Sequence, residues 1–178
     1  MKKRKIYLRG TTMLLVMAGC SKNDTPVVPT EENENSVQLA GKGGGPSANG
    51  QGSLTTIAGD TRHFSFHANT TGNGTVQGSG VLNITAGGTQ IKFDINCLNV
   101  VGNVATMSGT IRQSNNPVAV VGTGCWFRVV DNGEGSNAPA DQITLFAFFP
   151  NNPNPPTCAN NLLIGLNLVE GGNIQVKP

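Results

Sequence analysis

The sequence predicts an all-β protein, an antiparallel β-sandwich or jelly roll of about nine strands. The chain has 178 residues, enough for one domain of this kind. Only 12% of the residues are charged and 24 are Gly, a composition unlike that of helical bundles, coiled coils or charge-rich disordered chains. Short segments that alternate apolar and polar residues are separated by turns rich in Gly and Asn. We expect no helix beyond the N-terminal signal.

Residues 1–19 are predicted to be a secretion signal. Five of the twelve basic residues lie in the first nine positions, and the uncharged, largely apolar stretch 10–19 follows. This stretch is shorter than the roughly 20 apolar residues that cross a bilayer. The sequence Met17-Ala18-Gly19-Cys20 resembles the bacterial lipobox. The resemblance implies that Cys20 is acylated and becomes the mature N-terminus, so that the membrane is a partner through this lipid.

Residues 20–35 are predicted to form a flexible tether, since they show no apolar periodicity and contain prolines and several acids. The segment that starts at Cys20, Cys-Ser-Lys-Asn-Asp, resembles an export signal of Gram-negative lipoproteins. It implies surface exposure on the outer membrane, with the periplasmic face as the alternative. Without residues 1–19 the chain has seven basic and ten acidic residues, a formal charge of −3 that disfavours nucleic acid.

The β domain is expected to span residues 36–178. Residues 62–67 and 90–97 alternate most clearly, so each should bury one face of a strand. The segment 41–50 is either a glycine-rich linker or a tight turn after a first edge strand. The core is expected to consist of Val, Ile, Leu, the seven Phe and Trp126. The predicted strands are 37–40, 62–67, 75–85, 90–97, 104–113, 118–130, 142–149, 161–168 and 173–177.

Glycines inside two predicted strands call for an explanation, because glycine weakens a strand by up to about 1 kcal/mol. They occur at Gly78 and Gly80, and at Gly122 and Gly124. We expect bulges, curvature or the close approach of a neighbouring side chain at these positions. The alternative is a groove for a ligand.

Several stretches together resemble an uncharacterised all-β domain of bacterial cell-surface proteins, where it often lies downstream of immunoglobulin-like repeats. The stretches are Gly43-Gly44-Gly45, Phe64-Ser65-Phe66, the run from Leu98 to Ile111, and the run from Val129 to Gly135 with Asp141 after it. The resemblance covers about residues 41–149 and extends to the terminal stretch 172–176. It implies a β-sandwich and conveys no catalytic residue.

Three cysteines remain besides Cys20. Alternation places Cys97 and Cys125 on inward faces of their strands, whereas Cys158 lies in an irregular, proline-rich segment. A disulfide at Cys158 would therefore add most to the stability of the domain, on the order of 3 to 4 kcal/mol in the free energy of unfolding. The residues themselves leave three outcomes open: a bridge to Cys97, a bridge to Cys125, or three free thiols. The resemblance implies the pair Cys97 and Cys158, because in that domain the cysteine before the Gly-Asn motif tends to pair with a late one.

The acidic segment after the sixth predicted strand is a candidate calcium site. Asp131, Asn132, Glu134 and Asp141 offer the hard oxygen ligands that Ca²⁺ prefers, within a glycine-rich turn. The spacing matches no EF-hand. The alternative is that these side chains cap the backbone of their own loop. No other cofactor is expected.

No motif predicts an enzyme. The sequence lacks a Gly-x-Ser-x-Gly elbow, a His-Glu-x-x-His zinc motif, a phosphate loop and a dinucleotide fingerprint. His63 and His67 lie on a predicted strand with their side chains starting about 13 Å apart, too far for one metal ion. A hydrolase built from two of the domain's six acids is a weaker alternative.

Two functions remain in view for what we expect to be a monomer. The first is a surface accessory or adhesion module that binds an extracellular glycan or protein through loops, with Trp126 and residues 131–141 as candidate contacts. The second is a structural envelope lipoprotein without a small ligand. Trp126 lies on the face opposite Cys125, together with Arg128, and is either exposed or covered by a loop. An exposed Trp126 would favour binding; a buried one with a uniformly polar surface would favour the structural role.

Overall fold

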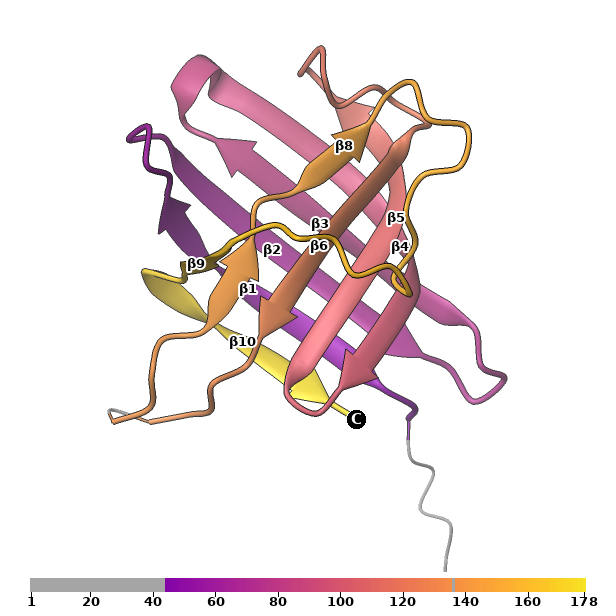
Figure 1. Cartoon of the computed structure of the whole chain (residues 1–178), viewed down its shortest axis with the longest axis vertical. Helices are drawn as coiled ribbons and strands as arrows, with labels where there is room; N and C mark the ends of the chain where they lie inside the picture. Colours follow the sequence, from indigo (N-terminus) through magenta and orange to yellow (C-terminus); the bar gives the residue numbers. More distant parts are fainter. Residues whose placement is uncertain (1–43, 136) are drawn as a thin grey trace, which may run out of the picture. The chain divides into compact units, whose positions relative to one another are not determined.

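The computed structural model describes residues 44–135 and 137–178, and more than half of these residues lie in antiparallel strands (Figure 1). Nine strands follow one another across a single sheet in the order β10-β1-β2-β3-β4-β5-β6-β7-β9, and β8 pairs with β6 as well. The prediction of an all-β, antiparallel fold is confirmed. The strands are β1 (Ser47–Thr55), β2 (Thr61–Thr70), β3 (Val76–Ile84), β4 (Thr89–Val101), β5 (Val104–Ser114), β6 (Gly124–Val130), β7 (Gln142–Thr144), β8 (Ala147–Phe149), β9 (Leu166–Leu168) and β10 (Gly171–Lys177).

The sheet is a meander that curls on itself in a sandwich-like way. Each strand from β1 to β6 pairs with the next, β7 pairs with β9, and β10 returns to pair with β1. Aromatic rings fill the space inside the curl. The ring centroid of Phe127 on β6 lies 5.3 Å from that of Phe66 on β2, 5.7 Å from Phe93 on β4 and 4.5 Å from Phe146. The core therefore joins strands that are distant along the sheet.

A β-bulge at Asn96 reverses the faces of β4. Ile95 pairs with Gly109 of β5, but the next paired residue is Cys97, which pairs with Ser108. Beyond the bulge, Leu98 packs against the core. Alternation then puts Cys97 on the outer face. The prediction that Cys97 points inward is therefore wrong, because strict alternation fails where one residue is left without a partner.

Several boundaries differ from those predicted. β1 (Ser47–Thr55) occupies part of the glycine-rich segment expected to be a linker or turn. β6 begins only at Gly124, because turns occupy much of residues 115–123. The predicted strand 142–149 is divided into β7 and β8, and the predicted strand 161–168 is regular only in β9. The predicted domain start at residue 36 and the strand 37–40 lie outside the described residues.

Two of the strand glycines make room for a neighbouring side chain. A Cβ atom on Gly80 would overlap the ring of Phe93, and one on Gly124 would overlap Pro155. The close-approach explanation therefore holds at both positions. Gly122 instead lies in a turn, with φ of 84°, a conformation that favours glycine.

Candidate functional site

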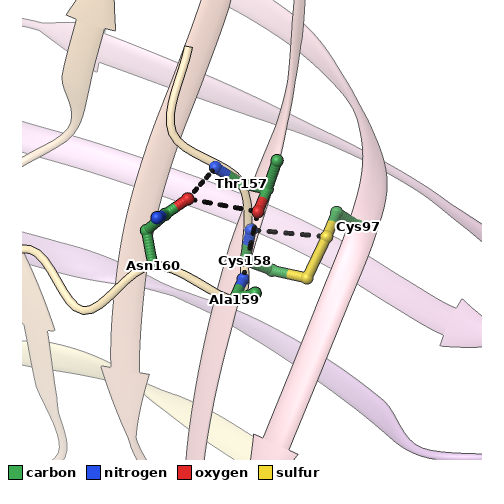
Figure 2. Close-up of a disulfide and its surroundings, with 5 residues drawn as sticks. All are labelled: Cys97, Thr157, Cys158, Ala159 and Asn160. Atoms are coloured by element: carbon green, nitrogen blue, oxygen red, sulfur yellow. Dashed lines mark hydrogen bonds between the residues drawn. A yellow bond between two sulfur atoms is a disulfide. The ribbon is translucent and has the colours of Figure 1, made fainter. Parts of the chain in front are cut away.

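A disulfide joins Cys97 of β4 to Cys158, with 5.5 Å between their Cα atoms (Figure 2). The backbone N–H of Cys158 also donates a hydrogen bond to Sγ of Cys97, at 3.3 Å. The predicted pairing is confirmed. Cys125 is a free thiol buried in the core, as its alternation predicted. Burial raises the pKa of Cys125 to about 12, so this thiol stays protonated at neutral pH.

The disulfide fixes residues 150–165, which we call the tethered loop. This loop connects β8 to β9 and crosses in front of β5 and β6 (Figure 1). Local turns also hold it. Oδ1 of Asn160 accepts hydrogen bonds from the backbone N–H and the hydroxyl of Thr157, at 2.8 and 3.2 Å (Figure 2). Pro155 packs against Gly124 of β6. The loop thus has one fixed course over the outer face of the sheet.

Trp126 is buried on this outer face. Its side chain is 0% exposed and stands apart from the aromatic core, with Ser108 and Ala147 as its neighbours on adjacent strands. The expectation that Trp126 contacts a ligand is corrected, because no part of its surface is free. Its indole Nε1 has no hydrogen-bond partner within the described residues.

Arg128 lies beside Trp126 on the same face, half-buried. Its guanidinium carbon is 5.1 Å from the centroid of the Trp126 ring, within the range of a cation–π interaction. Its Nε donates a hydrogen bond to Oγ1 of Thr106, at 3.2 Å. Its backbone N–H donates to Oγ1 of Thr144, at 2.9 Å. Thr106 and the Trp126 ring therefore hold the guanidinium, while Thr144 holds the backbone of the same residue.

A hollow of about 320 Å³ opens between these strands and the tethered loop. We call it the Arg128 hollow. Asn99, Thr106 and Arg128 stand side by side on β4, β5 and β6 and form its floor. Residues 158–161 of the tethered loop form one wall, while Val101 and Val104 contribute an apolar side. The structure thus brings together an arginine, amide groups and apolar surface next to the disulfide.

Sequence reasoning missed the Arg128 hollow. Alternation did show that Trp126 and Arg128 share a face. Alternation could not show that residues 158–161 lie on this face. The disulfide between Cys97 and Cys158, which are 61 residues apart in the sequence, brings them there. No local pattern indicates such a contact.

A larger hollow, of about 520 Å³, lies on the outer face of β1, β2 and β3. Its side chains include Gln51, His63, Ser65 and Asn83. His63 and His67 are exposed on β2, as expected. Val81 adds apolar surface, and no Asp, Glu, Lys or Arg lines this hollow.

The acidic loop 131–141 lies along β10. Asp141 accepts hydrogen bonds from the backbone N–H groups of Asn132, at 2.9 Å, and Ile174, at 2.7 Å. Asp131 accepts hydrogen bonds from the backbone N–H groups of Gly133, at 2.8 Å, and Val176, at 2.9 Å. Each carboxylate therefore connects its own loop to the last strand.

The remaining two candidate ligands also bind the protein itself. Glu134 accepts hydrogen bonds from Nδ2 of Asn173, at 2.8 Å, and Nε2 of Gln175, at 3.2 Å. Asn132 donates its side-chain amide to the carbonyl of Ala140, at 2.7 Å. Among residues 44–135 and 137–178, no three His, Cys, Asp or Glu side chains form a group that could hold a metal ion. Asp131, Asn132 and Asp141 thus bind backbone groups of their own loop or of β10, and Glu134 binds two side-chain amides of β10, so the alternative role as caps accounts for their positions. The calcium site stays a prediction.

Comparisons with family models, with curated proteins and with solved structures found nothing that matches the chain. In the part of the chain that the structure describes, no helix has the length and apolar character needed to cross a membrane.

Proposed function

We propose that the chain is a lipid-anchored, non-catalytic accessory module that binds an extracellular glycan or protein at the surface of a Gram-negative outer membrane. The anchor is the acylated Cys20, and residues 20–35 are the tether. Both lie outside the described residues, so the order of basic, apolar and small residues before Cys20 supports this part of the proposal.

The tethered loop is the observation that carries the binding role. Loops of more than about 12 to 15 residues without regular structure are uncommon in compact domains, and ordered ones often serve function. This loop has 16 residues between β8 and β9, and a disulfide holds it on a rigid sheet. It forms a wall of the Arg128 hollow. A fixed loop beside a hollow is how many β proteins present a binding surface.

The positions of the acids support a non-catalytic role over a hydrolase. Each of the six acidic side chains in the described residues has a partner within the protein. Asp94 is exposed and lies 3.6 Å from Arg112. The partners of the other acids, Asp60, Asp131, Glu134, Asp141 and Glu170, are backbone N–H groups or side-chain donors. Asp131 and Asp141 each accept two backbone N–H groups, which gives both carboxylates a structural role in holding β10.

A glycan array tests the binding role. The full chain, purified in mild detergent, should bind a subset of immobilised glycans. The double variant C97S/C158S, whose loop is no longer tied to β4, should bind them more weakly while keeping a β-sheet circular dichroism spectrum. An array without hits for well-folded protein, together with no captured protein ligand, would count against this function.

A structural envelope role is the second candidate, because Trp126 is buried rather than exposed. The surface is nevertheless not uniformly polar, since Leu163, Leu166 and Leu168 are exposed. A structural role predicts that cells lacking the protein become sensitive to detergent. It also predicts that the variant C97S/C158S, provided that it folds, restores their resistance. A binding role predicts that this variant fails to restore function.

The anchor is tested by the variant C20A. Without the thiol no thioether to lipid can form, so the protein should leave the membrane fraction and enter the aqueous phase of a detergent partition. The variant C125A, which keeps Cys20, is the matched control and should remain with the membranes. Protease treatment of intact cells then distinguishes the outer surface, where the domain is cleaved, from the periplasmic face, where it is protected.

A further inference from the structure

We propose that the Arg128 hollow binds the carboxylate of an acidic sugar residue, such as a uronic acid, within a glycan. The inference rests on the proposed binding function and names the ligand class of its site.

Arg128 is prepared for a carboxylate that the protein itself does not provide. In the described residues, Arg62 is paired with Asp60 and Arg112 with Asp94, whereas Arg128 lies near no acidic side chain. Only its Nε is used, by Thr106. The two terminal amino groups form no hydrogen bond within the described protein. A planar guanidinium with free amino groups binds a carboxylate through two parallel hydrogen bonds.

The position of the guanidinium strengthens this preference. Thr106 fixes one edge of it, and the Trp126 ring lies beneath it at 5.1 Å. Since Trp126 is fully buried, this side of the guanidinium is shielded from water. A charge that is partly withdrawn from water attracts an anion more strongly than an exposed one. Little rotational freedom remains for Arg128 to lose on binding.

The rest of the hollow suits a sugar ring. Asn99, Asn160 and Asn161 supply amide groups, which donate and accept hydrogen bonds as sugar hydroxyls require. In Asn160 the oxygen is occupied by Thr157, which leaves the amide nitrogen as a donor. Val101 and Val104 offer apolar surface for the C–H groups of a ring. The volume of about 320 Å³ is at the low end for ligand sites and favours a single sugar unit.

Trp126 provides the measurement, because it is the only tryptophan in the chain. The full chain in detergent is titrated with methyl glucuronide, with the methyl ester of that sugar and with neutral methyl glucoside, while Trp126 fluorescence is recorded. Calorimetry serves as the second readout. We expect a saturable signal for the glucuronide, and affinities lower by roughly ten- to hundredfold for the ester and the glucoside, which lack the charge.

The variant R128Q removes the charge and should weaken glucuronide binding by roughly the same ten- to hundredfold. R112Q is the matched control, because Arg112 is an exposed arginine paired with Asp94 and distant from the hollow's lining. It should bind as the unmodified protein does. Rising salt concentration should weaken binding of the glucuronide to the unmodified protein.

Three results would overturn the inference: equal binding by R128Q and the unmodified protein, equal binding of the ester and the acid, or equal binding of inorganic sulfate. Glycans from the array that bind R128Q normally but C97S/C158S weakly would leave the proposed function intact and remove this ligand class. If no glycan on the array and no glucuronide binds the unmodified protein, both the proposed binding function and this ligand class are wrong.

Discussion

Asp141 shows how one buried carboxylate can connect distant parts of a chain. Its two oxygens accept backbone N–H groups from Asn132 in its own loop and from Ile174 in β10. Hydrogen bonds to a charged group contribute about 1.5 to 3 kcal/mol each, more than neutral ones. A single side chain therefore holds both the end of the acidic loop and the middle of the last strand.

We expect the substitution D141N to lower the free energy of unfolding by about 1.5 to 3 kcal/mol. The amide keeps the size of the side chain, but it loses the charge and turns an NH₂ group toward an N–H donor. Urea denaturation followed by circular dichroism measures the change. D94N is the control, since Asp94 is exposed and its pair with Arg112 should contribute less than about 1 kcal/mol. Equal effects of the two substitutions would contradict this role of Asp141.

Cys125 should resist alkylation in the folded protein. Burial raises its pKa from 9.0 to about 12, so almost no thiolate exists at pH 8. Iodoacetamide should leave the peptide that contains Cys125 unmodified in buffer and modify it fully in denaturant, as mass spectrometry would show.

The same shift in pKa has a consequence for stability. The folded state keeps a proton that the unfolded state releases, so stability should fall as the pH rises from about 9 toward 12. The variant C125A should lack this part of the pH dependence. Rapid modification of native Cys125 at pH 8 would contradict both expectations.

At the scale of elements, the disulfide and the tethered loop cover Trp126. In the variant C97S/C158S we expect the loop to move away from β6, with a red shift of Trp126 fluorescence as water reaches the indole. A lost bridge that closes a loop of 61 residues costs at most about 4 kcal/mol in the chain-entropy model. C125A keeps the bridge and should show the unmodified spectrum. An unchanged spectrum in the double variant would mean that the turns alone hold the loop.

Clean alternation made part of the fold predictable. The pattern of β2, with Phe64 and Phe66 inward and His63 and His67 outward, follows directly from a two-residue period. The face of Cys97 did not follow, because the bulge at Asn96 depends on how β5 pairs with β4. β1 was missed because its glycines weaken the strand signal, whereas its pairing with β2 and β10 stabilises it.

The candidate site was only partly predictable, for a related reason. The cysteine pairing was anticipated, but the cover over Trp126 and the hollow beside Arg128 depend on contacts between residues far apart in sequence. The acids of loop 131–141 were identified as oxygen ligands, which is chemically correct. Their partners include N–H groups of β10, and a single sequence does not show which strand lies beside a loop.

At the scale of the whole domain, β10 is the last strand of the described residues and lies beside the first. It pairs with β1 over seven residue pairs and places Ile174 in the core, where it is 0% exposed. On its other side, Asp131 and Asp141 accept its N–H groups. β10 is thus held on both sides, by β1 and by the acidic loop.

Deletion of residues 171–178 should therefore prevent stable folding. It removes a buried side chain, leaves β1 without its outer partner and leaves two carboxylates without their donors. Limited proteolysis should degrade the truncated domain at concentrations that leave the full chain intact. Removal of Pro178 alone is the control and should have no effect, because this residue is exposed and lies outside β10. A protease-resistant truncated domain would contradict the role assigned to β10.

The carboxylates beside β10 also decide how the protein behaves when crowded. A free strand edge offers N–H groups to strands of other chains, which is a common route to aggregation. Here Asp131 and Asp141 occupy the outward N–H groups of Ile174 and Val176, and they bring negative charge to that edge. At high protein concentration this edge should therefore not recruit the strand of a neighbouring copy. Two aspartates thereby disfavour edge-to-edge association of the sheet.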